Sequence, residues 1–497
     1  MQYADALKYL DEHSSYERTG RVDSPSTSNI EKLLDAIGNP QHSYRSIHIT
    51  GTNGKGSTAQ IITKLLMAHG LRVGTYSSPH INRINDRICI NGEPIDDVEF
   101  GLQVGAISDL EILLAIRPSF FEIMTAAMFR WFADSAVDVA VVEVGMLGRW
   151  DATNVINSDV AVITNIALDH MEYAGPTVEH IAREKAGIIR PSSALVLGET
   201  DELLREIFLA EDARARLIRD EDFACEDNFL AIGGRMISIR TPRAKYEDVI
   251  LPLHGQHQGD NASLAICAVE EFFGDTINRE ILDEGMANVK MPGRFEVLGH
   301  RPLAIIDGAH NPAGAEVCAS VFFEDFNTQG RKILVTGALR SRNPEDLLLS
   351  FRANEFDVVI TCMPPTPRGL PAEEMAEVRI PIPDQPGAAP SGPPAGRPRG
   401  RGADLGPMGA RTEDTAGLDP LDAKWAAFGW QVESVDGHDH RQLHDVLSAS
   451  PKGRGKPLCV IANTFKGKGV SFMHDNVAWH HGVPNKEQFE QAMRELV

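Results

Sequence analysis

Residues 46–70 read SIHITGTNGKGSTAQIITKLLMAHG, and this stretch decides the fold of the first domain. Its first five residues form a short β-branched run, which is typical of a buried strand, and its last twelve carry apolar residues at helical spacing. Thr50-Gly51-Thr52-Asn53-Gly54-Lys55-Gly56-Ser57 lies between them and must turn the chain from one element into the other. We therefore predict a strand, a glycine-rich loop and a helix.

A loop of this composition can bind phosphate. Glycines let successive backbone N–H groups point at phosphate oxygens, and the helix N-terminus adds positive charge. Lys55 can reach the outer phosphates and Ser57 can ligate Mg²⁺. The spacing departs from the common GxxxxGK[ST] pattern because Ile49 stands where the first glycine would be. A glycine-rich surface turn is the alternative, but the setting favours an ATP site formed by Gly51, Thr52, Asn53, Gly54, Lys55, Gly56, Ser57 and Thr58.

The alternation of strands and helices continues on both sides of this loop. Residues 1–40 carry two helical patterns, the second ending at Gly38. Three further apolar runs have the length of strands, at residues 136–145, 158–166 and 194–198. Continuous apolar strands separated by helix-length segments indicate a parallel sheet covered on both faces. We predict an α/β fold, with a parallel-sheet, P-loop ATPase domain over residues 1–296.

The rest of the chain divides into three parts. Strand-like runs at 301–310, 331–337 and 355–363 predict a smaller, Rossmann-like α/β domain over residues 297–380. Residues 381–402 are rich in Pro, Gly, Ala and Arg, and they cannot bury enough apolar surface to offset their ordering entropy, so we predict a disordered linker. For residues 403–497 we again predict folded structure, an α/β tail with a strand in KPLCVIANTF and a terminal helix.

Composition limits the partners of the protein. The 497 residues carry 48 basic and 70 acidic side chains, a net charge of −22, which repels nucleic acid and anionic membranes. No apolar run approaches the ~20 residues that span a bilayer, and the N-terminus lacks the apolar core of a signal peptide. The six cysteines form no CxxC pair, and we predict that they are reduced thiols. We expect a cytoplasmic, monomeric protein that acts on small molecules and binds neither nucleic acid nor membranes.

The loop GTNGKGS resembles that of the folylpolyglutamate synthase/dihydrofolate synthase family of Mur-ligase-like enzymes, and the resemblance extends to about residue 380. The segment Tyr76-Ser77-Ser78-Pro79-His80, followed by Arg83 and Asp86-Arg87-Ile88, is similar to the next family motif, with Asp86 in place of the usual Glu. The resemblance implies that this segment faces the pterin and the substrate carboxylates, with Arg83 as an anion clamp. The implied substrate-binding residues here are Ser78, Pro79, His80 and Arg83.

Carboxylate and histidine side chains follow two of the predicted strands. Glu143 ends one apolar run, and His170 follows another. Ligands gather at such strand ends in open parallel sheets, and Mg²⁺ prefers oxygen ligands, so Ser57 and Glu143 suit one ion. The resemblance implies a second ion held by Glu143, His170 and a carbamylated Lys185. From the residues alone, the segment around Lys185 reads as a solvated helix face and His170 as an ordinary polar residue.

Gly148-Arg149-Trp150-Asp151-Ala152-Thr153-Asn154 is similar to the family motif GGRxDATN, with Leu147 where a second glycine is usual. We expect this replacement to narrow the conformational freedom of the loop. Residues 254–262 are similar to a further family element and imply that Asn261, with Gln258, contacts the nucleotide.

Two more motifs lie at and beyond the domain junction. Met291-Pro292-Gly293-Arg294-Phe295-Glu296 matches the family's PGRxE, so Arg294 can supply positive charge to ATP phosphates when the domains close. The alternative is an interdomain turn with a surface arginine. Ile306-Asp307-Gly308-Ala309-His310 opens the second domain, and the resemblance implies that Asp307 contacts the nucleotide and His310 the incoming glutamate.

The resemblance stops near residue 380, before the last elements that the family's second domain usually has. Residues 411–496 instead resemble the end of a transketolase thiamine-diphosphate domain, without the segments that bind its cofactor. We expect no transketolase activity, and we interpret Lys466-Gly467-Lys468-Gly469 as scaffold, not as a second ATP site. The sequence leaves open a gene fusion and a reading frame that continues into a neighbour.

The motifs together predict an ATP- and Mg²⁺-dependent ligase that joins L-glutamate to dihydropteroate, to a folate or to both, through an acyl phosphate. The implied catalytic residues are Lys55, Lys185 and His310. Three alternatives remain: a nucleotide-binding fusion protein with impaired catalysis, an amide ligase for a peptidoglycan precursor, and a tail that serves as an interaction module.

Overall fold

The computed structural model describes residues 1–15, 26–168, 174–326, 330–366, 368–378, 422–423, 426, 431–448, 458–463, 468–474 and 484–496. The chain forms two compact units. The first contains Met1–Gln329, Val335–Ala353 and Thr361–Ile380, and the second contains Gly330–Leu334, Asn354–Ile360 and Pro381–Val497. The linker predicted at 381–402 lies outside the described residues.

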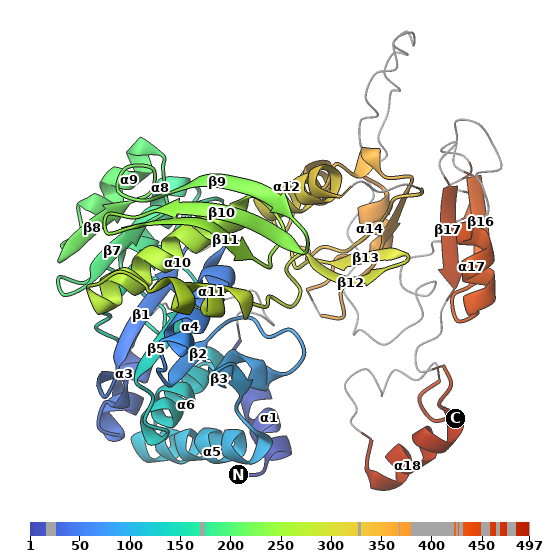
Figure 1. Ribbon diagram of the computed structural model, residues 1–497. Coiled ribbons are helices and arrows are strands. Elements are labelled where there is room, and N and C mark those ends of the chain that lie inside the picture. Colours follow the sequence, from blue (N-terminus) through green and yellow to red (C-terminus); the bar gives the residue numbers. More distant parts are fainter. Residues whose placement is uncertain are drawn as a thin grey trace. The chain divides into compact units, whose positions relative to one another are not determined.

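An eight-stranded sheet forms the centre of the first unit (Figure 1). Its order is β4 (Glu93–Pro94), β3 (Ile88–Ile90), β2 (Val73–Tyr76), β5 (Val139–Glu143), β1 (Arg45–Thr50), β6 (Val160–Ile163), β7 (Ala194–Leu197) and β8 (Ala215–Ile218). β2, β5, β1, β6, β7 and β8 are parallel, whereas β3 pairs antiparallel with β2, and β4 pairs antiparallel with β3. The predicted parallel sheet is confirmed, and its four predicted strands are β1, β5, β6 and β7; β2, β3, β4 and β8 were not predicted.

Alternate residues of the central strands enter different cores, because side chains of a strand point to opposite faces. Val139 and Val141 of β5 pack in one core with α4 (Lys55–Ala68), α10 (His257–Phe273) and α11 (Arg279–Ala287). Ala140 and Val142 of the same strand pack in the other core. The helices of that second core are α1 (Tyr3–Asp11), α3 (Ser28–Ala36), α5 (Asp97–Leu114) and α6 (Phe120–Asp134). Both faces of the sheet are therefore covered, as predicted.

A third core lies beside β6 and β7, under α8 (Val178–Ala186) and α9 (Glu202–Leu209). Single 3₁₀ turns occur at η1 (Pro40–His42), η2 (Ile84–Arg87) and η4 (Ala353–Glu355). In the described part of the chain, no helix has the length and hydrophobicity needed to cross a membrane.

A three-stranded antiparallel sheet was not predicted from the sequence. It consists of β9 (Ala224–Ala231), β10 (Gly234–Arg240) and β11 (Lys245–Leu251), in the order β11-β10-β9. β9 is half exposed and contains several polar residues, so hydrophobic periodicity gives little signal there. Antiparallel pairing with β10 holds it instead, through a turn at Gly233, whose φ is +79°.

The second domain begins with the hairpin β12 (Glu296–His300) and β13 (Leu303–Ile306). It continues with α12 (Pro312–Ser320), the π-helix η3 (Val321–Asp325), β14 (Ile333–Thr336), α13 (Pro344–Ser350), β15 (Val358–Thr361) and α14 (Ala372–Ala376). β14 pairs with β15, and the three predicted strands of this domain are confirmed.

The tail, within its described residues, contains strands and helices. β16 (Gln431–Asp436) and β17 (Leu458–Asn463) are parallel neighbours. The helices are α17 (His440–Ser448) and α18 (Lys486–Glu495). The predicted strand and terminal helix are thus present, and the predicted scaffold segment at 466–469 lies partly outside the described residues.

Candidate active site

The phosphate loop connects β1 to α4. Gly51 has a φ of +148° and Gly54 a φ of +83°, and a Cβ at these positions would lie 1.8 Å from Thr164 Oγ1 and 2.5 Å from Asn261 Oδ1. Glycine is therefore required at both positions. α4 begins at Lys55, so the unpaired N–H groups and positive dipole end of the helix lie at the loop. This geometry suits a phosphate group.

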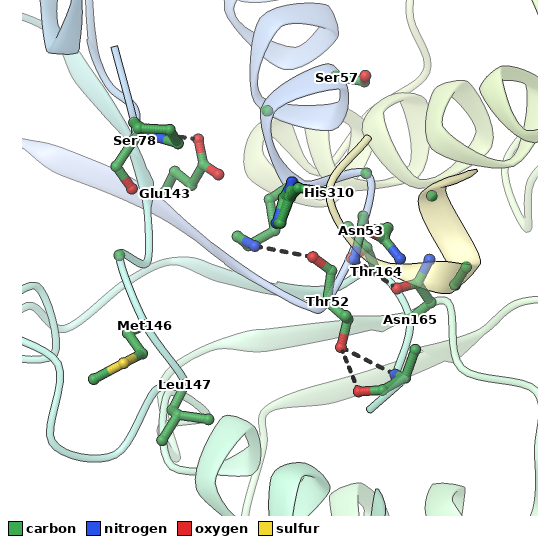
Figure 2. Close-up of a pocket in the computed structure, with 18 of the residues that line it drawn as sticks. Thr52, Asn53, Ser57, Ser78, Glu143, Met146, Leu147, Thr164, Asn165 and His310 are labelled. Carbon is green, nitrogen blue, oxygen red and sulfur yellow. Dashed lines mark hydrogen bonds between the residues drawn. The ribbon is translucent and has the colours of Figure 1, made fainter. Parts of the chain in front are cut away.

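Hydrogen bonds from the end of β6 hold the loop in shape (Figure 2). The N–H groups of Thr52 and Asn53 donate to O and Oδ1 of Asn165, at 2.8 and 2.9 Å. Thr164 Oγ1 donates to the backbone O of Asn53 at 2.6 Å. The Nζ atom of Lys55 donates to two carbonyl oxygens of the loop, at 3.1 and 3.2 Å. The lysine ammonium group therefore lies over the loop, where phosphate oxygens would bind.

A cavity of about 1540 Å³ opens over the loop. The predicted site residues that line it are Thr52, Asn53, Gly54, Lys55, Gly56, Ser57, Ser78, Pro79, His80, Glu143, Asn261, Arg294, Asp307 and His310. Gly51 and Lys185 line a second, small cavity, which shares Thr52 and Lys55 with the first. Thr58 is buried in α4 and does not line either cavity. His170 lies outside the described residues.

Glu143 ends β5 with its carboxylate buried beside the phosphate loop. Its Oε2 accepts a hydrogen bond from the N–H of Ser78 at 3.4 Å and lies 3.7 Å from where a Cβ on Gly56 would be. Burial raises the pKa of Glu143, against the opposing charge of Lys55. A buried ionised carboxylate needs compensating positive charge.

The carboxylate of Glu143 lies beside the first turn of α4, and carboxylate and hydroxyl oxygens are ligands that Mg²⁺ prefers. Mg²⁺ usually completes its shell with water and substrate phosphate. Within the described residues, which exclude His170, no three His, Cys, Asp or Glu side chains are grouped to hold a metal. A site built from Ser57 and Glu143 therefore depends on bound nucleotide for further ligands.

Lys185 lies on the inner face of α8, with 4% of its surface exposed. Its Nζ donates to the backbone O of Gly51 at 2.7 Å. The interpretation of this segment as a solvated helix face is thus wrong for Lys185, because the side chain turns inward and contacts the phosphate loop. The predicted carbamylation stays a prediction.

The segment after β2 is divided between the cavity and the surface. Arg87 is fully buried, and its Nε lies 3.0 Å from Nδ1 of His80, which lines the cavity. Arg83 instead donates to Asp97 Oδ1 at 2.6 Å, and its guanidinium lies 5.4 Å from the ring of Tyr3. Arg83 is not among the cavity residues. The structure therefore does not place Arg83 in the lining of this cavity, and its predicted role as a clamp for substrate carboxylates stays a prediction.

Asp307 lies beside the predicted junction between the two domains. Its Oδ2 accepts a hydrogen bond from the N–H of Phe295 at 2.7 Å, directly after Arg294. In the next turn, Asn311 Nδ2 donates to Asn53 Oδ1 of the phosphate loop at 3.2 Å. These contacts bring Arg294 and Asp307 to the cavity beside the loop. In this structure the carboxylate of Asp307 therefore accepts a hydrogen bond from the backbone of the junction.

His310 is an exposed side chain at the wall of the same cavity (Figure 2). Its Nδ1 lies 2.9 Å from the backbone O of Gly308. The imidazole is therefore held by its own turn at a place where a second substrate can enter.

Leu147 adopts the left-handed backbone conformation, with a φ of +60°. This conformation is unfavourable for leucine and easy for glycine. The backbone O of Leu147 accepts a hydrogen bond from Thr50 Oγ1 at 2.6 Å, and its side chain is buried. The loop after β5 is thus fixed against β1, which agrees with the expected loss of freedom.

Several cavity residues were not predicted as site residues. They are Phe120, Phe121, Trp150, Thr164, Asn165, Glu199 and Arg219. Thr164, Glu199 and Arg219 follow β6, β7 and β8 directly or by one residue, so their position after buried strands was the available signal. Phe120 and Phe121 lie in the first turn of α6 and carry no local signal that separates them from core residues.

Comparisons with known proteins agree with this geometry. The Mur ligase middle domain matches residues 110–269, and the Mur ligase glutamate ligase domain matches residues 293–385. The chain is 40% identical over 385 residues to the dihydrofolate synthase/folylpolyglutamate synthase of Mycobacterium tuberculosis, which covers 72% of this chain and 77% of that protein. It is 34% identical to the folylpolyglutamate synthase of Lacticaseibacillus casei, over 75% of this chain and 88% of that protein.

Solved structures show the same similarity. The folylpolyglutamate synthase of Mycobacterium tuberculosis, complexed with ADP and AMPPCP, superposes with a TM-score of 0.70 at 38% identity, over 75% of this chain and 85% of that chain. A complex of a folylpolyglutamate synthase with AMPPCP and folate gives a TM-score of 0.67 at 31% identity, over 74% of this chain and 90% of that chain. This chain therefore belongs to the dihydrofolate synthase/folylpolyglutamate synthase family, within the Mur ligases.

Proposed function

We propose that this protein is an ATP-dependent ligase that joins L-glutamate to the carboxylate of dihydropteroate, of a folate, or of both. One observation carries the proposal: the phosphate loop, Glu143, the junction residue Arg294, and Asp307 and His310 of the second domain line a single cavity. A phosphoryl donor, an acid and an amine must meet for such a ligation, and this cavity has room for all three. The names of the relatives support the same two acid substrates.

In the first step, a carboxylate oxygen of the acid attacks the γ-phosphorus of ATP, the bond to the β-phosphate oxygen breaks, and ADP leaves an acyl phosphate behind. Charge spreads over the oxygens of the transferring group, so fixed positive charge lowers the barrier. Lys55, whose ammonium group lies over the loop, and Arg294 at the junction supply that charge.

In the second step, the deprotonated amine of glutamate attacks the acyl carbon and forms a tetrahedral intermediate, which collapses to the amide and releases phosphate. His310 lies at the cavity wall on the second domain and would orient this amine. Holding amine and acyl phosphate together makes the step effectively intramolecular.

Mg²⁺ would be held by Ser57 and Glu143, and it would neutralise and orient the phosphate oxygens. The inward-facing Lys185, once carbamylated, and His170 would complete a second ion site with Glu143. Loss of a proton from Lys185 would be the prerequisite, because only a neutral amine reacts with carbon dioxide.

Product analysis tests the proposal. The full chain would be incubated with ATP, Mg²⁺ and L-glutamate, with dihydropteroate in one reaction and tetrahydrofolate in another, and the products separated by mass spectrometry. We expect a product with one added glutamyl residue in at least one reaction. Tight ATP binding without any glutamyl product would instead support the fusion protein with impaired catalysis.

A further inference from the structure

The cavity extends to both sides of the phosphate loop, and its two sides differ in chemistry. β1 lies between β5 and β6 in the sheet. Beyond β6, the lining residues are mainly polar: Thr164, Asn165, Glu199, Thr200, Arg219 and Asp260. The β5 side carries large apolar and aromatic side chains, Phe120, Phe121, Met146, Leu147 and Trp150, together with polar ones that include Arg117, Ser119, Glu122 and Asp151. The second side therefore suits a flat group with apolar faces and polar edges.

Trp150 is presented to this side by a rigid loop. The N–H of Arg149 donates to the backbone O of Glu184 at 2.8 Å, and the N–H of Met146 donates to Asp151 Oδ2 at 2.9 Å. Leu147 and Asp151 are 9% and 7% exposed, yet Trp150 between them is 52% exposed. A fixed backbone thus holds an indole at the cavity wall with half of its surface open to a ligand.

Phe121, on the same side of the cavity, is fixed as well. The ring of Phe121 lies against Gly145, where a Cβ would be 2.3 Å from its Cζ atom, and its centroid is 5.8 Å from that of Tyr76. The capping box of Ser119 and Glu122 defines the start of α6 beneath it. The aromatic side of the cavity is therefore formed before any substrate binds.

We propose that Trp150 is a specificity-determining residue that stacks on the planar ring system of the acid substrate. This rests on the proposed function, because pteroates and folates carry a flat pteridine and a flat aminobenzoyl group. Stacking against an indole holds such a ring and is tolerant of its exact substituents. The adenine ring of ATP is also flat, so a titration with AMPPCP is needed to distinguish the two rings.

Tryptophan fluorescence tests the proposal on the full chain without requiring turnover. Pteroate would be titrated into wild-type protein, Trp150→Phe and Trp131→Phe, with free N-acetyltryptophanamide correcting for absorption by the pterin. Trp131 lies in α6 and packs against the core, so it is the matched control. Trp425, Trp430 and Trp479 lie outside the described residues, and they are present in all three proteins.

We expect pteroate to quench the wild type and Trp131→Phe, and to quench Trp150→Phe much less. Equal quenching of all three proteins would overturn the proposal. Quenching of Trp150 by AMPPCP, with no response to pteroate, would also overturn it, since the indole would then face the nucleotide.

Kinetics supply the second readout. Trp150→Ala should raise the KM for the acid substrate about tenfold or more, as expected for loss of one stacking contact, while the KM for ATP stays unchanged. Trp150→Phe should recover most of the loss. Equal increases in both KM values would contradict a role in acid binding. If the chain formed no glutamyl product, the proposed function would fail, and the fluorescence titration would still decide the role of Trp150.

Discussion

His48 lies in β1, two residues before the loop, and it is fully buried. Its Nε2 is 2.9 Å from Thr153 Oγ1, and burial lowers the pKa of His48 to about 3. In the unfolded chain the pKa is near 6.5, so between these values the unfolded state binds one proton more. The free energy of unfolding should therefore fall as the pH falls through this window.

Replacing His48 by Gln should remove this contribution to the pH dependence of the free energy of unfolding. The contribution amounts to up to about 1.4 kcal/mol for each pH unit. Urea unfolding at pH 7, 6 and 5 measures it. His42→Gln is the control, because His42 is exposed and its loss should leave the slope unchanged. The same slope in wild type and His48→Gln would contradict the assignment.

Glu143 combines stability and function at one residue. Burial raises the pKa of Glu143. In metal-free protein, at pH values above the pKa of the unfolded state, keeping this carboxylate ionised therefore costs the folded state free energy. The free energy of unfolding should fall as the pH rises through that region. Glu143→Gln should raise the melting temperature of metal-free protein at pH 8 more than at pH 5. It should also lower ADP release by about a hundredfold or more, because the metal loses its protein carboxylate. Turnover equal to the wild type would exclude Glu143 as a ligand.

At this scale the sequence was informative where a motif fixes the backbone. Gly51 and Gly54 could be predicted because only glycine fits their turn, and Lys55 because a phosphate loop needs its charge. The position of Arg83 could not be predicted, because its ion-pair partner Asp97 is the first residue of α5 and lies outside the motif. The inward direction of Lys185 likewise depends on how α8 packs, which the sequence of the helix alone does not decide.

At the scale of elements, a buried ion pair connects the three-stranded sheet to the second domain. Arg235 of β10 and Asp325 of η3 are 3.0 Å apart, with 3% and 9% of their side-chain surfaces exposed. Arg235 Nε also donates to Asn228 Oδ1 at 2.7 Å, and the N–H of Gly255 donates to Asp325 Oδ2 at 3.2 Å. Breaking such a pair leaves an uncompensated buried charge.

Asp325→Ala should therefore lower the free energy of unfolding by about 3–5 kcal/mol. The exposed pair of Arg279 and Asp283 in α11 is the matched control, and Asp283→Ala should cost less than about 1 kcal/mol. Denaturant unfolding of both variants gives the comparison. Equal effects would show that the Arg235–Asp325 pair contributes no more than a surface pair.

The elements that could be predicted share one property, which is continuous burial. β1, β5, β6 and β7 are buried along almost their whole length because both faces of the sheet are covered, and the apolar runs of β5, β6 and β7 stand out in the sequence. β9 is half exposed and polar, and its pairing with β10 is determined by the neighbouring strand, not by its own pattern.

At the scale of the whole molecule, the described cavity residues all lie between Ser14 and Arg368. A chain that ends at residue 402 should therefore retain ATP-dependent turnover with the same KM values. Steady-state ADP release by the shortened and the full chain checks this. Loss of turnover in a shortened protein that still binds ATP would mean that residues 403–497 contribute to catalysis.

The most direct test of the ligase assignment is ADP release by the purified full-length chain. ATP, Mg²⁺ and glutamate would be supplied with dihydropteroate or with tetrahydrofolate, and Lys55→Ala would serve as the control. We predict turnover that requires the acid substrate and disappears in Lys55→Ala, because the ammonium group over the phosphate loop is lost. Absence of turnover with both acids, while ATP binding is intact, would contradict the assignment of this chain as an active ligase.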